Sequence, residues 1–189
     1  MTQPATPSPS RRSRMLLAAA VIALVLLADL WTKQWAWDAL RGGKRIALVE
    51  QVLYLKFGFN TGSAFSLLQD AEWSRVFFIA VTLLALAYMA WLCSQMSTRQ
   101  RYGFTAIGLI AGGALGNLHD RFVRHMELPV NGELVQRHGV IDFIQFFYDW
   151  EGGSYWPIFN VADAALVCGV VLLLLHLRAE DKARERAAA

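Results

Sequence analysis

Four long apolar stretches, joined by shorter polar segments, constrain this 189-residue chain more than any other feature of its sequence. Each stretch is long enough to approach the ~30 Å hydrocarbon core of a bilayer at ~1.5 Å of rise per helical residue. Only 17% of the residues are charged, against about 25% in an average soluble domain. We therefore expect an all-α integral membrane protein with four transmembrane helices, at 15–37, 76–93, 102–118 and about 156–177.

The segments outside these stretches predict the domain organisation. Residues 1–14 are rich in proline and then in arginine, so we expect a disordered cytoplasmic tail there. Residues 15–178 form one four-helix membrane domain, and residues 179–189 form a charged cytoplasmic tail. No small-x-small cleavage site closes the first apolar stretch, and three tryptophans extend it as an interfacial belt, so it reads as a retained helix and not as a signal peptide.

The basic residues are distributed unevenly between the two sides of the predicted bundle. Nine Lys or Arg residues lie in residues 1–14, 97–102 and 178–189, whereas six lie in the much longer loops 38–72 and 123–156. By the positive-inside rule, both termini are expected in the cytoplasm. The net charge of +3 is thus explained by the membrane topology. The sequence has no basic face interleaved with aromatic residues, so nucleic-acid binding is not expected.

The two long loops are expected on the extracytoplasmic side. Residues 53–59 alternate apolar side chains with Tyr54, Lys56 and Gly58, which predicts a half-buried strand and hence a small extracytoplasmic β-sheet with a loop cradle. The 123–156 loop has turn residues but no clear period. Its structure cannot be predicted from the sequence.

Ionisable residues inside or beside the apolar stretches are costly and need a partner or a purpose. Asp29 and Lys33 stand at i and i+4, with the acid first, which favours an ion pair on one helix face. The pair is explained either as a structural salt bridge or as part of a site. Asn117, Asp120 and Arg121 also share one face, and the guanidinium of Arg121 can hold a carboxylate. This cluster either ties helices together or contacts a substrate.

Two acids, Asp142 and Asp163, stand in apolar runs with no Lys or Arg within four positions. Asn160 and Asp163 fall at i and i+3 of the fourth helix, and Asn60 with Gly62 forms a turn that can hydrogen-bond an extended peptide. All of these residues map to the extracytoplasmic third of the bundle, which suggests one site. Intramembrane acids also serve as proton relays, so a proton-coupled membrane transporter is the alternative function.

The histidines, cysteines and serines do not support a metallopeptidase or a serine peptidase. The four histidines include no H-E-x-x-H pair, and the two cysteines have no paired spacing, so we expect neither a metal nor a cofactor. No serine stands at helical spacing from a histidine or lysine at the depth of the site. The carboxylates therefore remain as the candidate catalytic groups.

Five ordered motifs resemble the lipoprotein signal peptidase family, signal peptidase II, over about residues 15–177. They are Asp29-x-x-x-Lys33, Asn60-x-Gly62-x-Ala64-Phe65, Gly112-Gly113-x-x-Gly116-Asn117-x-x-Asp120-Arg121, Val140-Ile141-Asp142-Phe143 and Phe159-Asn160-x-Ala162-Asp163. The stretch from Phe122 to Gly139 is longer than is usual for the family, and His119 stands where an apolar residue is more usual.

The resemblance implies a bacterial inner-membrane aspartic endopeptidase that cuts prolipoproteins before a diacylglyceryl-modified cysteine. Such an enzyme meets membrane lipid and its lipidated substrate, binds no nucleic acid, and is expected to be a monomer without a cofactor. The family's roles carry to residues of this chain as follows: catalytic, Asp142 and Asp163; substrate-binding, Asn60, Gly62, Asn117, Arg121 and Asn160; supporting polar residues, Asp29, Lys33 and Asp120.

The charge asymmetry makes the first testable prediction. A reporter that is active only in the cytoplasm, fused after residue 189, should be active, and the same reporter inserted in the 123–156 loop should be inactive. Activity only in the loop fusion would reverse the topology.

Overall fold

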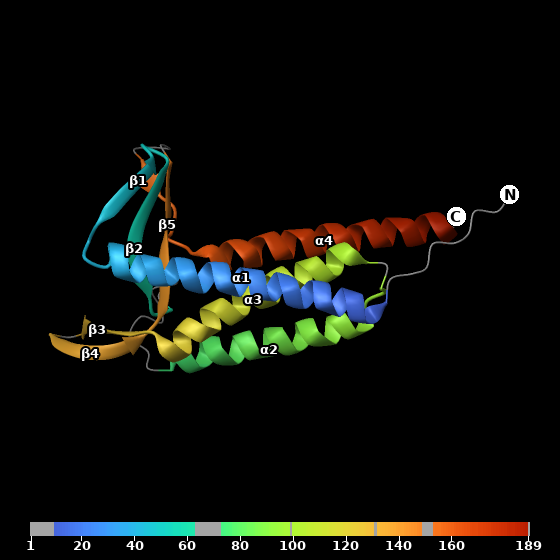
Figure 1. Cartoon of the computed structure of the whole chain (residues 1–189), viewed down its shortest axis with the longest axis horizontal. Helices are drawn as coiled ribbons and strands as arrows, with labels where there is room; N and C mark the ends of the chain where they lie inside the picture. The colour runs from blue at the N-terminus through green and yellow to red at the C-terminus, as the bar shows by residue number, and fades with distance from the viewer. Residues whose placement is uncertain (1–9, 63–72, 99, 131, 149–152, 189) are drawn as a thin grey trace.

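The computed structural model describes residues 10–62, 73–98, 100–130, 132–148 and 153–188. Four long helices lie lengthwise beside one another: α1 (Arg11–Leu40), α2 (Ser74–Gln95), α3 (Arg101–Val123) and α4 (Val161–Ala188). The strands gather at one end of this bundle, and α1 begins and α4 ends at the opposite end (Figure 1). The predicted segment Ala64–Phe65 lies outside the described residues.

Among the described residues, three helices are long and apolar enough to cross a membrane: α1, α2 and α4. Their outward faces expose large apolar side chains such as Leu27, Leu84 and Val167, which suits a lipid environment. The helix α3 does not meet this criterion, because glycines and polar residues dilute its apolar character. It is instead enclosed, packing against the other three helices with fourteen of its 23 residues buried. We expected four lipid-spanning helices, whereas the described residues show three helices of that kind around an inner one.

Small residues let the neighbours of α3 approach closely. A Cβ atom added at Gly113 would overlap the carbonyl oxygen of Ala162 in α4, and one added at Gly108 would lie 3.0 Å from the carbonyl oxygen of Ala18 in α1. Close backbone approach through small residues is the usual packing mode of membrane helices. It brings the polar end of α3 against both α1 and the start of α4.

A four-stranded antiparallel sheet crosses the end of the bundle in the order β1-β2-β5-β6. Its strands are β1 (Arg45–Val49), β2 (Leu53–Asn60), β5 (Val140–Tyr148) and β6 (Ser154–Tyr155). The strand predicted at 53–59 is confirmed, and Leu55, Phe57 and Phe59 pack against the apolar cluster that contains Leu40 of α1. The β2–β5 register places Gly58 opposite Asp142.

The long segment that could not be predicted forms a separate hairpin. Strands β3 (His125–Val130) and β4 (Glu133–His138) pair antiparallel and project from the end of α3 (Figure 1). The hairpin returns directly into β5. With six strands, the described residues hold more β structure than the all-α expectation.

The helices are longer than predicted at most of their ends, and α3 runs five residues further, to Val123, while α4 begins later than predicted. The helix α1 begins four residues early, at Arg11, because the Ser10 side chain accepts a hydrogen bond from the Ser13 amide and caps it. The helix α4 begins at Val161 and not at about 156, because the preceding residues bond to β5: the Trp156 amide donates to Phe146 O. At its other end α4 continues to Ala188, through the predicted charged tail.

The close approach at Gly113 makes a stability prediction. Gly113→Ala should lower the free energy of unfolding by about 1–3 kcal/mol, because the added methyl group overlaps backbone that has little freedom to move. Thermal unfolding in detergent measures this, with Gly42→Ala as the matched control, since nothing lies within 4 Å of a Cβ added there. Equal melting temperatures for the two variants would contradict the packing.

Candidate active site

The two acids that stood alone in the sequence meet at the sheet end of the bundle. Asp142 lies on β5 and is only 4% exposed, whereas Asp163 lies in the first turn of α4. Backbone hydrogen bonds hold these elements together, because the amides of Phe143 and Ile144 both donate to the carbonyl oxygen of Phe159. The chain that leads into α4 is thereby fixed beside the strand that carries Asp142.

Asn160 joins the two carboxyl groups. Its side-chain Nδ2 donates to Asp142 Oδ1 at 2.7 Å, and its backbone amide donates to Asp163 Oδ2 at 3.2 Å. The Asp163 amide donates in return to Asn160 Oδ1 at 2.9 Å. This reciprocal pair is a capping box, built here from Asn and Asp, and it accounts for the i, i+3 spacing of the two residues. The start of α4 therefore places Asp163 as a consequence of how the helix begins.

Two further asparagines complete the shell. Asn60 Nδ2 donates to Asp142 Oδ2 at 3.1 Å, and Asn117 Nδ2 donates to Asp163 Oδ1 at 2.8 Å. Asn60 Oδ1 accepts a hydrogen bond from the amide of Gly62, whose φ of +105° favours glycine. Each of the four carboxylate oxygens thus faces one nitrogen donor.

The surroundings perturb the titration of Asp142. Burial and, next, the negative charge of Asp163 raise the pKa of Asp142 from 3.8 to about 7. The hydrogen bonds from Asn60 and Asn160 and the charge of Lys33 act in the opposite direction without cancelling this effect. A pair of carboxyl groups in this state can share one proton near neutral pH.

A buried charge cluster lies behind the carboxyl pair. The Lys33 ammonium lies 2.8 Å from Asp29 Oδ2 and 3.3 Å from Asp120 Oδ2, and all three side chains are fully buried. Lys33 Nζ also donates to Asn117 Oδ1 at 2.9 Å. The predicted Asp29–Lys33 pair is confirmed, and Asp120 is its third member.

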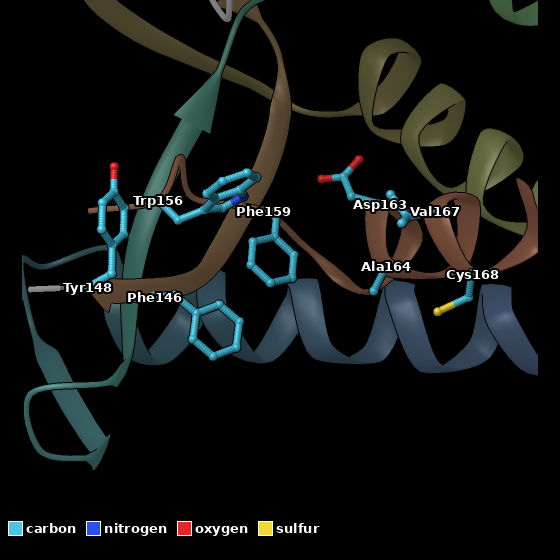
Figure 2. A pocket seen from close by; sticks show the side chains of 8 residues that line it. All are labelled: Phe146, Tyr148, Trp156, Phe159, Asp163, Ala164, Val167 and Cys168. Atoms are coloured by element: carbon cyan, nitrogen blue, oxygen red, sulfur yellow. The ribbon is translucent and has the colours of Figure 1, made fainter. Parts of the chain in front are cut away.

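An apolar pocket of about 570 Å³ opens beside Asp163. Aromatic rings from β5 and from the segment before α4 face the first turns of α4 across it (Figure 2). Its lining residues are Phe146, Tyr148, Trp156, Phe159, Asp163, Ala164, Val167 and Cys168. Asp163 is the acidic member of this otherwise uncharged lining.

Comparisons with known proteins identify the family of this chain. The family model described as Signal peptidase (SPase) II matches residues 21–179. The lipoprotein signal peptidase of Shouchella clausii is 36% identical over 169 residues, covering 89% of this chain and 97% of the relative, and that of Pseudomonas putida is 32% identical, covering 86% of each. A solved bacterial membrane enzyme is similar with a TM-score of 0.67 at 26% identity, over 85% of this chain and 91% of its own.

The chain belongs to the signal peptidase II family. The resemblance inferred from five motifs is thereby confirmed, and the transporter alternative has no support from the comparisons. Among the described residues, no group of three or more His, Cys, Asp or Glu side chains is placed to hold a metal ion.

Most of the predicted site residues converge. Those around the carboxyl pair are Asn60, Gly62, Asn117, Asp142, Asn160 and Asp163, and those in the charge cluster behind it are Asp29, Lys33 and Asp120.

Arg121 follows Asn117 by one helical turn on α3, and its guanidinium lies over the ring of Phe78 in α2, 5.0 Å from the centroid. Its Nη1 donates to the carbonyl oxygen of Asn117 at 3.2 Å. Within the described part of the chain its guanidinium forms no ion pair with a carboxylate, and its contact with Phe78 ties α3 to α2.

The pocket and two backbone donors were missed by the sequence reasoning. Phe146 and Tyr148 stand at i and i+2 of a strand, a spacing that places both on one face and was available as a signal. The amides of Ile141 and Ala162 donate to Asp120 Oδ2 and Asp29 Oδ1. Backbone donors of this kind leave no mark on the sequence.

The raised pKa of Asp142 makes a prediction about stability. In wild-type protein, folding becomes less favourable as pH rises from about 4 to about 7, because the folded state keeps a proton on Asp142 that the unfolded state has released. Asp142→Asn removes this titration, so its stability relative to wild type should rise over that window by on the order of a few kcal/mol and then level off.

Melting temperatures of both proteins between pH 4 and pH 8 measure the effect. The lost hydrogen-bond acceptor adds a constant offset, so the change with pH is the diagnostic quantity. Glu133→Gln, at an exposed position on the hairpin, is the control. A wild-type-minus-variant difference that does not change with pH would contradict the raised pKa.

Proposed function

We propose that the chain cleaves the signal peptide from prolipoproteins on the N-terminal side of a diacylglyceryl-modified cysteine, with Asp142 and Asp163 as its catalytic pair. One observation carries the assignment of the pair: two carboxyl groups, one of them almost fully buried, are hydrogen-bonded to the same asparagine in a member of the signal peptidase II family. Arrangements of this kind share a proton and activate water.

The mechanism uses the two protonation states together. Asp142, with its pKa near 7, holds the shared proton and donates a hydrogen bond to the scissile carbonyl oxygen. Ionised Asp163 takes a proton from water as the water oxygen attacks the carbonyl carbon. When the tetrahedral intermediate collapses, the carbon–nitrogen bond breaks and Asp163 returns that proton to the leaving amine. The products are the carboxyl end of the signal peptide and the amino group of the cysteine.

The asparagines and Arg121 are proposed to bind the extended peptide around the scissile bond. Asn60 and Gly62 lie at the end of β2, next to Asp142, where a peptide crossing the sheet meets polar groups. Arg121 has a half-buried guanidinium close enough for its charge to interact with those of Asp142 and Asp163. These contacts orient the carbonyl for attack.

The aromatic pocket is proposed to receive an apolar part of the substrate. It lies directly beside Asp163 and is lined almost entirely by apolar side chains. A lipidated cysteine presents apolar chains next to the scissile bond. The pocket would hold the apolar chains, and the carboxyl pair would act on the scissile bond.

The placement in the cell is part of the proposal. All four helices span the bacterial inner membrane, both termini are cytoplasmic, and the site lies near the extracytoplasmic face. In support, Arg14 Nε donates to the carbonyl oxygen of Thr98 at 2.7 Å at the end of the bundle opposite the sheets, where basic residues are concentrated. We assign residues 15–178 to the peptidase domain and propose that it acts as a monomer.

The function is tested by reconstituting the full chain in phospholipid vesicles with a precursor in lipidated and unlipidated forms. Cleavage of the lipidated form alone is expected. A proton-coupled transporter would cleave neither form and would instead move protons across the vesicle membrane.

The shared proton makes a prediction about the catalytic pair. Asp142→Asn and Asp163→Asn should each abolish cleavage, and the double variant should be no worse than either single one, because the two groups act as a unit. Cleavage of the lipidated precursor measures this, with Asp181→Asn, an exposed position on α4, as the control. Near-wild-type turnover in a correctly inserted single variant would remove that carboxyl group from the mechanism.

A further inference from the structure

A lysine buried behind the catalytic pair has no direct role in the proposed chemistry. The Lys33 side chain is fully buried, and its ammonium contacts Asp29, Asp120 and Asn117. We infer that Lys33 is a positioning residue for catalysis, which fixes the orientation of the Asn117 side-chain amide and thereby determines which of the two carboxyl groups carries the shared proton. The inference rests on the proposed function of Asp142 and Asp163.

The first step concerns the amide of Asn117. An ammonium group only donates hydrogen bonds, so Asn117 must turn Oδ1 toward Lys33 Nζ, at 2.9 Å. The other end of the amide, Nδ2, then faces Asp163 Oδ1 at 2.8 Å. If the amide turned over, two donors would meet at Lys33 and two acceptors would meet at Asp163. The lysine therefore excludes the turned-over state.

The second step compares Lys33 with the other described contact of Asn117 Oδ1, which orients the amide less strongly. Asn160 Nδ2 also donates to Asn117 Oδ1, at 3.1 Å. It has two hydrogens but three acceptors, because Asp142 Oδ1 lies at 2.7 Å and the Ile141 carbonyl oxygen at 3.3 Å. The bond to Asn117 is therefore shared, and Asn160 alone cannot hold the amide. Lys33 makes the shorter contact.

The third step connects the amide to the proton. A donor aimed at Asp163 Oδ1 favours the ionised form of Asp163, which the mechanism needs as its base. An acceptor at the same place is tolerated only if Asp163 carries the proton. The Lys33 charge also lowers the pKa of Asp142, and the experiment below keeps the net charge of the cluster constant for this reason. Through the amide, loss of Lys33 acts toward Asp163: an acceptor turned to Asp163 Oδ1 draws the shared proton to Asp163, which leaves the wrong group protonated when substrate binds.

The counter-ions of Lys33 hold the backbone on both sides of the pair. Asp29 Oδ1 accepts from the amide of Ala162, next to Asp163, at 2.9 Å, and Asp120 Oδ2 accepts from the amide of Ile141, next to Asp142, at 3.1 Å. A Cβ atom added at Gly116 would overlap Asp29 Oδ2, so the carboxylate has no room to move on that side. One ammonium thus orders groups beside both catalytic residues.

Other charged groups face this region and must be held constant in a test of pH dependence. His119 Nδ1 of α3 and Nε of Arg124, the residue that follows α3, lie 3.4 Å and 3.9 Å from Asp120 Oδ1. The charge of Arg121, also on α3, acts on Asp142, Asp163 and Asp120. Asp29 faces the cluster from α1, Asp142 from β5 and Asp163 from α4.

The experiment compares two variants: one removes the lysine that orients the Asn117 amide, and the other removes the amide itself. Lys33→Met with Asp29→Asn removes one positive and one negative charge, so the net charge of the buried cluster is unchanged and folding is favoured. Asn117→Leu removes the amide and leaves all three buried charges in place. Full-length proteins in phospholipid vesicles are assayed for kcat, KM and the pH profile of kcat with a lipidated precursor.

We expect both variants to lose about 10²-fold in kcat with KM changed less than threefold. We also expect a displaced pH optimum in both variants. Combining the two changes should cost no more than Asn117→Leu alone, because Lys33 acts through Asn117. Arg14→Met, which removes a cation at the other end of the bundle, should change the melting temperature without moving the pH optimum.

Two results would overturn the inference: a wild-type pH profile in Asn117→Leu, or losses that add fully when the two changes are combined. Should the lysine variant not fold, the Asn117→Leu profile still decides the first of these. Continued cleavage by Asp142→Asn or Asp163→Asn would instead reject the catalytic pair itself, so the two failures are distinguishable.

Discussion

The buried ion cluster of Lys33 with Asp29 and Asp120 is the constraint on which the rest of the arrangement depends. Isolated charges cost about 2.5–3.5 kcal/mol or more inside a membrane, so each must keep its partners at short range. Lys33 Nζ lies within 3.3 Å of a carboxylate oxygen on α1 and of another on α3. Each acid also accepts a hydrogen bond from a backbone amide, Asp29 from Ala162 of α4 and Asp120 from Ile141 of β5. Satisfying one ammonium therefore fixes four elements relative to one another.

This constraint operates because the elements are able to meet. The glycines of α3 let its backbone approach α1 and α4, which brings Asn117 within hydrogen-bond distance of both Lys33 and Asp163. The capping box at the start of α4 then sets the side chain of Asp163, while pairing of the preceding segment with β5 sets Asp142. Each contact comes from how an element begins or packs, and the site is their common result.

Much of this could be predicted from the sequence, because it depends on local spacing. The Asp29–Lys33 pair follows from i, i+4 geometry, and the strand at 53–59 follows from alternation. The start of α4 could not be predicted, because its preceding residues are apolar like the helix and their pairing with β5 is a long-range contact. The orientation of the Arg121 guanidinium also depends on a long-range neighbour, the ring of Phe78 in α2. Helical spacing does not identify such neighbours.

The inner position of α3 explains why hydropathy describes this helix poorly. A helix that meets only protein needs small residues for packing and tolerates polar ones, as long as each finds a partner. Asn117 and Asp120 find theirs in Lys33 and the first turn of α4. Asp142 is the exception, since its partners do not offset its burial beside Asp163 and its pKa stays near 7. The buried charges of α1 and α3 are thus paired at short range, whereas Asp142 is held by two amide donors beside another carboxyl group and keeps a raised pKa.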